Sequence, residues 1–206
     1  MRVITKHPIA YDSHDHVEPK GTKNDNTRSL KFLNRAEEVI GKPVIRYADL
    51  GCSGGGIVSD FIERGHQAVG IEGSDYSLIN KRAEWGNEKV APFLFTADIT
   101  KPFTIVDGTQ HGGCCDLISA WDVLEHIHET DLDQLFTNIR NNLKTGGLFV
   151  ASVATFEDRG YHVTLQEKPW WLNKFAQHGL KDAEHVKSFD DAWGRSSTFG
   201  IVLEKV

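Results

Sequence analysis

The stretch YADLGCSGGGIVSDFIERG, residues 47–65, decides how we expect the chain to fold. It continues an apolar strand predicted at residues 44–48 and then turns at a cluster of glycines. Apolar residues recur at helical spacing over residues 57–62, and a glycine ends the predicted helix. A strand, a glycine turn and a helix form the unit from which nucleotide-binding α/β sheets are built. Asp49, an acid at the end of the strand, raises the question of which ligand the turn serves.

The alternation of strands and helices continues on both sides of this stretch. Further strands are predicted at residues 68–71, 92–96, 117–120 and 148–153, and in the tail segments HVKSF (185–189) and TFGIVLEKV (198–206). Further helices are predicted at residues 29–40, 74–85 and 132–143, and from Pro169 to a glycine stop. Because parallel strands need helical crossovers, the pattern predicts an α/β protein with a Rossmann-like, doubly wound, mainly parallel sheet covered by helices on both faces.

Composition limits the class of protein. The 206 residues suit one ordinary domain, and 39% hydrophobic residues are enough for a sizeable core. The net charge of −6 argues against a general binder of nucleic acids or membrane surfaces. No apolar run approaches the ~20 residues of a membrane span, residues 1–10 lack a secretory signal, and the cysteine usage does not suggest a disulfide framework. We therefore expect a soluble cytoplasmic protein, with its oligomeric state left open.

The first residues differ in character from the rest of the chain. Residues 1–28 are polar, and Pro8, Pro19 and Gly21 interrupt any regular period. We interpret them as an N-terminal arm or lid, which becomes ordered on ligand binding. Residues 29–206 are then a single catalytic domain.

Three acids end successive predicted strands: Asp49, Glu72 and Asp98. A dinucleotide fingerprint would read GxGxxG, whereas GCSGGG has Ser53 at the position of the second glycine. In addition, the negative charge of Asp49 would repel the pyrophosphate of a dinucleotide. Asp49 instead favours a ligand with a positive amino group, Glu72 suits ribose hydroxyls, and Asp98 suits an adenine amino group. Each acid also has an ordinary alternative, as a turn cap or a solvated side chain. Their recurrence at one edge of the sheet favours the ligand hypothesis.

These residues resemble the class I S-adenosylmethionine-dependent methyltransferases. DLGCSGG is similar to the DxGxGxG loop of that family, with Ser53 in place of the middle glycine. The resemblance implies S-adenosylmethionine as cofactor and a seven-stranded sheet whose last strand, at residues 198–205, is antiparallel. It also implies that Asp49 borders the methionine part, Glu72 the ribose and Asp98 the adenine. The residues expected at the cofactor are Asp49, Gly51, Cys52, Ser53, Gly55, Glu72, Gly73, Asp98, Ile99, Trp121 and Asp122.

The segment WDVLEHIHE supplies candidates for catalysis. In a helix, Asp122, Glu125 and His126 share one face, so two carboxylates and an imidazole can converge. The segment resembles that of ubiquinone-pathway O-methyltransferases and related small-molecule enzymes, some of which bind a divalent ion there. Three hypotheses stay open: His126 is a general base, the three residues bind Mg²⁺ or Mn²⁺, or Glu125 and His126 only orient the loop.

A second stretch, YHVTLQEKPWWLNKF, bears on the acceptor. His162 is a further candidate base, and the segment resembles one in bacterial and viral sugar-modifying methyltransferases. Trp171 and Phe175, four residues apart, are expected in the core, whereas Trp170 is a candidate platform for a sugar ring. We therefore expect an O-methyltransferase acting on a hydroxylated small molecule, with a sugar or glycan as favoured acceptor. The alternatives are a quinone or phenol acceptor, an NAD-dependent oxidoreductase, or a non-catalytic cofactor-binding module.

Overall fold

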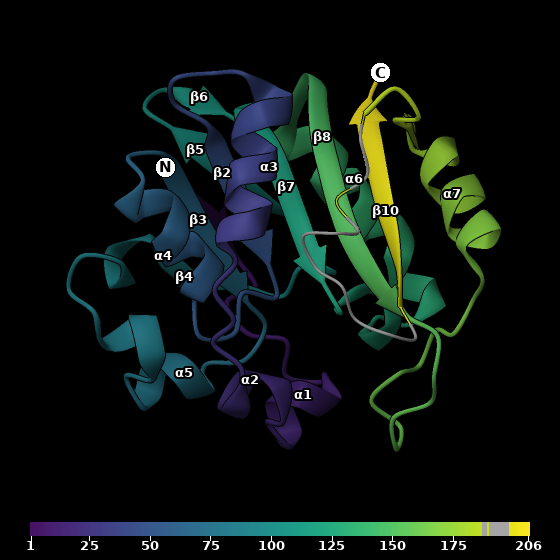
Figure 1. Ribbon diagram of the computed structural model, residues 1–206. Coiled ribbons are helices and arrows are strands. Elements are labelled where there is room, and N and C mark those ends of the chain that lie inside the picture. The colour runs from purple at the N-terminus through teal and green to yellow at the C-terminus, as the bar shows by residue number, and fades with distance from the viewer. Residues whose placement is uncertain (187–188, 190–197) are drawn as a thin grey trace.

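The computed structural model describes residues 1–186, 189 and 198–206, and its centre is a seven-stranded sheet (Figure 1). The strand order is β4-β3-β2-β7-β8-β10-β9, in which β4, β3, β2, β7 and β8 pair in parallel and β10 is antiparallel to both of its neighbours. The strands are β2 (Arg46–Leu50), β3 (Gln67–Glu72), β4 (Leu94–Thr96), β7 (Cys115–Trp121), β8 (Leu143–Ala154), β9 (Leu180–Asp182) and β10 (Thr198–Lys205). The predicted mainly parallel sheet with an antiparallel last strand is confirmed.

Helices cover both faces of the sheet. The long helices are α3 (Leu30–Ile40), α4 (Gly56–Glu63), α6 (Leu132–Asn142) and α7 (Lys168–Gln177). Side chains of α3 and α4 pack into one buried apolar cluster and those of α6 and α7 into another, and Figure 1 shows α3 in front of the sheet and α6 behind it. Alternate residues of β2 enter the two clusters, as the two-residue period of a strand requires: Tyr47 joins the first, Ala48 and Leu50 the second.

Local signals place most of these elements correctly. The Ser29 hydroxyl accepts the N–H of Phe32 at 3.3 Å and caps the start of α3, and Gly41 ends this helix with a φ of 62°. Trp171 and Phe175 are fully buried, which confirms their prediction as core residues.

The predicted helix at residues 74–85 is wrong as a single element. The chain instead forms α5 (Tyr76–Ile79) and a 3₁₀ turn, η1 (Ala83–Gly86). Lys81, which lies between them, and Ala83, the first residue of η1, take positive φ values of 47° and 48°, so the helix cannot continue. The indole N–H of Trp85 donates to the carbonyl oxygen of Ser53 at 2.8 Å, and this tertiary contact fixes the turn against the glycine loop. The other 3₁₀ turns are η2 (Ala91–Phe93), η3 (Leu124–His126) and η4 (Glu129–Asp131).

The two tail predictions have different outcomes. TFGIVLEKV forms β10, as expected. The strand predicted in HVKSF lies partly outside the described residues, since Lys187 and Ser188 are not described, and His185 and Val186 form a turn. The edge strand β9 lies before this segment, at Leu180–Asp182.

A second, three-stranded antiparallel sheet was not predicted. It consists of β1 (Arg2–Thr5), β5 (Phe103–Asp107) and β6 (Gln110–His111). Its strand β1 belongs to the N-terminal segment and pairs with residues about a hundred positions away, from Arg2 opposite Val106 to Thr5 opposite Phe103. Two short helices follow β1, α1 (His14–Val17) and α2 (Gly21–Asn24). Within the described residues, the helices are all too short or too polar to cross a bilayer.

Candidate functional site

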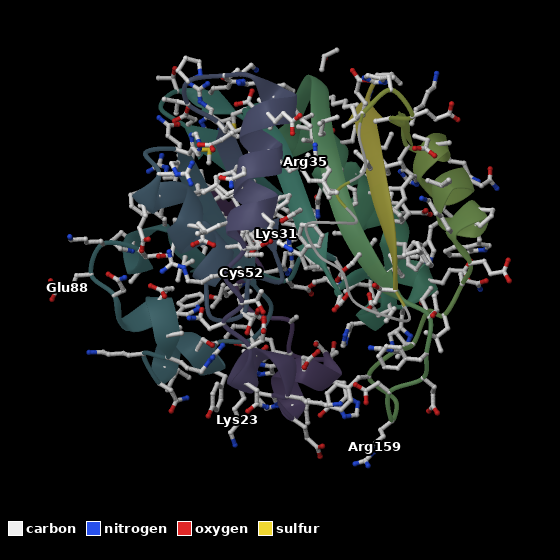
Figure 2. The ribbon with its side chains drawn as sticks, viewed as in Figure 1. Lys23, Lys31, Arg35, Cys52, Glu88 and Arg159 are labelled. Atoms are coloured by element: carbon white, nitrogen blue, oxygen red, sulfur yellow. The ribbon has the colours of Figure 1, made fainter. Side chains whose placement is uncertain are left out.

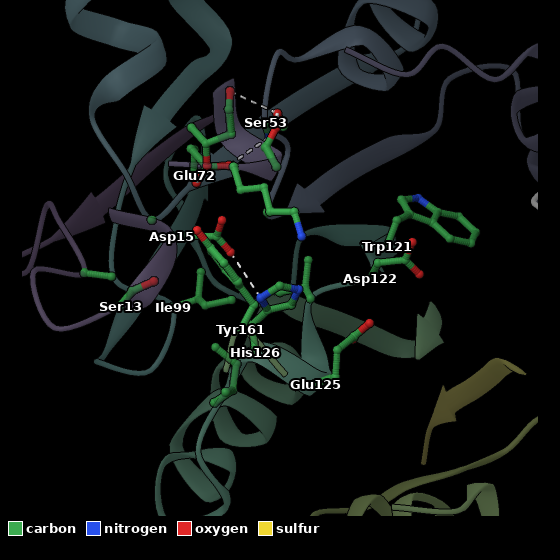
Figure 3. Close-up of a pocket in the computed structure, with 18 of the residues that line it drawn as sticks. Ser13, Asp15, Ser53, Glu72, Ile99, Trp121, Asp122, Glu125, His126 and Tyr161 are labelled. Atoms are coloured by element: carbon green, nitrogen blue, oxygen red, sulfur yellow. Dashed lines mark hydrogen bonds and ion pairs between the residues drawn. The ribbon is translucent and has the colours of Figure 1, made fainter. Parts of the chain in front are cut away.

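A cavity of about 630 Å³ lies at the carboxyl ends of β2, β3 and β7, with residues 10–27 forming part of its wall (Figure 3). The loop at residues 154–162 lines its other side. Of the residues predicted at the cofactor or the acceptor, all but Gly55 and Trp170 line this cavity. Gly55 caps α4 with a φ of 86°, and a side chain there would collide with Leu94. The structure therefore gives Gly55 a packing role instead of a place in the wall.

Asp49 is buried, with only 3% of its surface exposed. The Ser119 hydroxyl donates to its Oδ1 at 2.7 Å, and the Tyr47 hydroxyl lies 2.6 Å from the same serine. Burial raises the pKa of Asp49 to about 7, assisted by the nearby carboxylates of Asp25 and Glu72 and opposed by the hydroxyl donors. A buried carboxyl group with this pKa becomes fully ionised near neutral pH only when a cation approaches it.

Glu72 is also buried, so the solvated alternative for this residue is wrong. The backbone N–H groups of Ser53 and Ser74 donate to its two carboxylate oxygens at 2.8 and 3.1 Å, and the Thr22 hydroxyl donates at 3.2 Å. Burial raises its pKa in spite of these donors. The carboxylate is thus held rigidly at the end of β3, next to the glycine loop and the N-terminal segment.

Asp98 is partly exposed and caps the following turn through its Oδ1, which accepts the N–H and the hydroxyl of Thr100 at 2.9 and 2.6 Å. Asp98 therefore both caps this turn and lines the cavity, and Ile99 lines the wall beside it.

Ser53, the residue in place of a glycine, ties the glycine loop to the N-terminal segment. It has a φ of 45°, and its hydroxyl lies 2.8 Å from the carbonyl oxygen of Asp25 and 3.1 Å from that of Gly21. Arg82 donates to the Ser53 hydroxyl at 2.9 Å and also binds the Asp25 carbonyl oxygen. A β-carbon on Gly56 would lie 2.4 Å from the carbonyl oxygen of Thr27. Part of this glycine run therefore makes room for the N-terminal segment.

Glu125 occupies the opposite end of the cavity, in η3. Its side chain is fully buried; Oε1 accepts the N–H of Ala154 at 2.9 Å, and Oε2 has no hydrogen-bond partner among the residues that the structure describes. Burial raises its pKa. Its carbonyl oxygen accepts the N–H groups of Val163 and Thr164, which joins η3 to the loop after β8.

His126 pairs with a residue of the N-terminal segment. Its Nδ1 lies 3.1 Å from Oδ2 of Asp15 in α1 (Figure 3). Burial by itself lowers the pKa of His126, but the hydrogen bond and charge of Asp15 raise it above its usual value. Burial raises the pKa of Asp15, yet His126 and the backbone amides of Lys20 and Gly21 leave it below its usual value.

The structure groups Glu125, His126 and His162, whose potential ligand atoms all lie within 4.8 Å of one another. Asp122 is outside this group, although the sequence places it with Glu125 and His126. The segment is a 3₁₀ turn that starts after Asp122, which has a positive φ of 52°, so the expected helical face does not form. Asp122 instead accepts a hydrogen bond from the Ser152 hydroxyl at 2.5 Å.

Several cavity residues escaped the sequence analysis: Asp15, Lys20, Thr22, Phe156, Asp158 and Tyr161. Asp15 stands between His14 and His16 in the chain, and neither histidine lines the cavity. Figure 2 shows Lys23 and Arg159 pointing outward, away from it. Trp170 does not line the cavity either, and Lys174 covers its ring at 5.2 Å, so its expected role as a sugar platform is not supported.

The comparisons agree with the fold. A sequence profile described as a methyltransferase domain matches residues 22–193. A comparison with curated protein sequences gave no match. Among solved structures, the PH0226 protein of Pyrococcus horikoshii is 15% identical with a TM-score of 0.64, covering 93% of this chain and 99% of that one. A TehB-like S-adenosylmethionine-dependent methyltransferase of Corynebacterium glutamicum is 18% identical with a TM-score of 0.60, over 90% and 92% of the two chains.

A third similar structure is the geranyl diphosphate C-methyltransferase of Streptomyces coelicolor, 15% identical with a TM-score of 0.58 over 86% of this chain and 80% of that one. The strand order and the cavity define a class I methyltransferase fold. The chain belongs to the methyltransferase-domain family and is a methyltransferase. The NAD-dependent oxidoreductase alternative does not fit this family.

Proposed function

We propose that the protein transfers the methyl group of S-adenosylmethionine to a hydroxyl of a small molecule, with a sugar or glycan as favoured acceptor. The observation that carries the proposal is the group of Glu125, His126 and His162 on the wall of the cavity that Asp49 and Glu72 also line. An alcohol must lose a proton as it attacks the methyl carbon, so an imidazole beside a carboxylate suits an oxygen acceptor.

In this proposal the cofactor occupies the half of the cavity at β2 and β3. The Asp49 carboxylate faces the amino group of the methionine part, and Glu72 accepts the ribose hydroxyls in addition to its backbone donors. Asp98 and Ile99 border the adenine. The remaining cofactor residues of the wall are Gly51, Cys52, Ser53, Gly73, Trp121 and Asp122.

The transfer itself is an in-line displacement. The acceptor oxygen forms a bond to the methyl carbon while the carbon–sulfur bond breaks, and its electron pair stays on sulfur, which gives S-adenosylhomocysteine. The hydroxyl proton passes to the imidazole of His126, whose Nδ1 is already engaged by Asp15. His162, with its Nδ1 2.6 Å from the carbonyl oxygen of Phe156, is the second imidazole at the same point.

A divalent cation is the second candidate for activating the hydroxyl. The buried Oε2 of Glu125, which has no hydrogen-bond partner among the described residues, and one ring nitrogen each of His126 and His162 fit such an ion. When bound there, Mg²⁺ or Mn²⁺ would lower the pKa of the hydroxyl. Loss of turnover with EDTA, restored by either ion, supports this version, and full turnover after exhaustive chelation supports the base alone.

The lining of the cavity supports a polar acceptor. Asp131, Asp158 and His128 line it together with the half-exposed ring of Phe156, so hydrogen-bonding groups and one apolar face are available, as sugar binding requires. A quinone or phenol acceptor, the alternative, would place a flat apolar ring against these charges. Because a structural neighbour transfers methyl to carbon, the fold itself does not select the acceptor atom.

Two measurements test the proposal. S-adenosylhomocysteine, and not NAD, is expected to raise the melting temperature. The protein is then incubated with S-adenosylmethionine and a panel of free sugars, nucleotide sugars, oligosaccharides, catechols and amines, and methylated products are located by mass spectrometry and NMR. A sugar methyl ether is the expected product; an N-methyl or C-methyl product contradicts the proposal. Cofactor binding without turnover on any acceptor supports the non-catalytic module instead.

A further inference from the structure

The end of the cavity that contains Glu125 is not built by residues 29–206 alone. Helix α1 of the N-terminal segment brings Asp15 against His126, although the two residues are far apart in the chain. The contact is the 3.1 Å pair between Oδ2 of Asp15 and Nδ1 of His126, and each side chain is 23% exposed. Figure 3 shows the other ring nitrogen of His126 facing away from Asp15, toward the side where Glu125 lies.

We propose that Asp15 is a positioning residue for His126, so that the N-terminal segment completes the acceptor half of the site. A carboxylate that accepts the Nδ1–H holds an imidazole in one tautomer and one orientation, with the lone pair on Nε2. That lone pair is then available at the point where Glu125 and His162 converge. Nε2 can take the acceptor proton or bind a cation only in this tautomer.

The segment that bears Asp15 is fixed on the acceptor side. The Tyr161 hydroxyl donates to the carbonyl oxygen of Glu18 at 2.9 Å, and the rings of His14 and Tyr161 lie 4.1 Å apart. Lys20 pairs with Asp158 at 2.6 Å. Helix α1 is therefore held against the loop that also carries His162.

The same segment is fixed on the cofactor side a few residues later. The Thr22 hydroxyl donates to Glu72, and the carbonyl oxygen of Asp25 accepts the Ser53 hydroxyl. Glu72 and Ser53 are proposed cofactor residues, so one short stretch, residues 14–25, joins the two halves of the cavity. Asp15 reaches His126 only when this stretch lies across the cavity, which links the closing of the segment to the readiness of the acceptor site.

The inference rests on the proposed function, and the experiment can show the failure of one without the failure of the other. The full chain, with ¹⁵N-labelled histidines and saturating S-adenosylhomocysteine, is compared as wild type, Asp15→Ala and Asp15→Asn. The His126 signals are assigned by their loss in His126→Gln. In the wild type, the Nδ1-protonated tautomer is expected for His126, and in both Asp15 variants a mixture with the Nε2-protonated form.

Turnover in the Asp15 variants is expected to fall about 10- to 100-fold, as for other residues that orient an active-site histidine, with the KM for S-adenosylmethionine changed less than about threefold. Asp15→Glu is expected to restore part of the turnover and of the tautomer preference. The control is Glu18→Gln in the same segment, whose side chain is 75% exposed and which is expected to change neither readout.

An unchanged His126 tautomer in both Asp15 variants overturns the inference, even if turnover falls, because the role of Asp15 is then structural only. A shifted tautomer without any hydroxyl methylation by the wild type upholds Asp15 as a positioning residue and contradicts the proposed function. The tautomer of His126 therefore tests the role of Asp15, and the methylated product tests the proposed function.

Discussion

The two halves of the cavity are built in different ways. The half that we propose for the cofactor lies at the ends of neighbouring parallel strands, where Asp49 is the penultimate residue of β2, Glu72 is the last residue of β3, and both are almost fully buried. The half that we propose for the acceptor comes from three segments far apart in the chain: the N-terminal helices, the turn η3 and the loop after β8. The first half is set by strand register, while the second depends on contacts between segments that have little regular structure of their own.

This difference determines how freely each half can change. A strand end in a parallel sheet cannot move without disturbing the register of both of its neighbours, so the cofactor half resists change. Loops and short helices tolerate substitution and insertion, and they carry specificity. We therefore expect substitutions in the acceptor half to change turnover and those in the cofactor half to change cofactor affinity.

The largest effect is expected from His126→Ala. Loss of the imidazole removes the proposed proton acceptor, so turnover should fall by about 10²- to 10⁴-fold. Affinity for S-adenosylhomocysteine, measured by calorimetry, should stay within about twofold. The matched control is His111→Ala, on the exposed strand β6. A parallel loss of cofactor affinity would show that the two halves are not separable.

Asp49→Asn should give the opposite pattern. The variant keeps the shape of the side chain but loses the charge that we propose faces the amino group of the cofactor. Affinity for S-adenosylhomocysteine is expected to fall about 10- to 100-fold, since a hydrogen bond to a charged group contributes about 1.5–3 kcal/mol. Glu88→Gln, at an exposed position, is the control. Unchanged affinity would remove Asp49 from the cofactor site.

The pKa of Asp49 predicts a pH dependence of cofactor binding. At a pH below about 7 the carboxyl group is protonated in the free protein and must release its proton to face a cation. Affinity for S-adenosylhomocysteine should therefore rise by up to about tenfold between pH 6 and pH 8, about half of it below pH 7, and level off above that. Calorimetry in two buffers of different ionisation enthalpy should detect proton release at pH 6, and Asp49→Asn should abolish it.

The same pKa predicts how stability depends on pH in the absence of ligand. The folded pKa of Asp49 lies above its unfolded value of 3.8, so the unfolded chain loses its proton first as the pH rises. The contribution of this group to stability is therefore fully present below pH 3.8 and is lost between there and about pH 7. Above pH 7, Asp49→Asn should melt at a higher temperature than the wild type without ligand; an equal or lower temperature contradicts the assignment.

The smallest effect is expected from Ser53→Gly, which gives the loop the middle glycine of the DxGxGxG pattern. Glycine adopts the positive φ at no cost, but the hydroxyl that holds the N-terminal segment is lost. Release of S-adenosylhomocysteine should become faster by about three- to tenfold, measured by stopped flow, because a hydrogen bond contributes about 0.5–1.5 kcal/mol. Ser53→Ala removes only the hydroxyl and should show the same acceleration. Unchanged release in both variants would separate the segment from cofactor exchange.

The same contrast between local and distant contacts separates the elements that the sequence predicts from those that it does not. The alternation of strands and helices was readable because hydrophobic periods and caps such as Ser29 and Gly41 are local signals. The break in the helix expected at residues 74–85 could not be predicted, since the contact of Trp85 with Ser53 overrides helical propensity there. The small sheet was missed because β1 finds its partner strand, β5, only in the folded protein.

The sequence by itself determined the class of the protein, because the acids at the ends of successive strands share an edge once the strands are parallel. For the same reason, most of the residues that it predicted at the cofactor line one cavity. Only the tertiary structure decided the acceptor half. It left Asp122 out, brought His162 in, and placed Asp15 on His126, since these positions depend on backbone turns and on the packing of distant segments, which leave no periodic pattern in the chain.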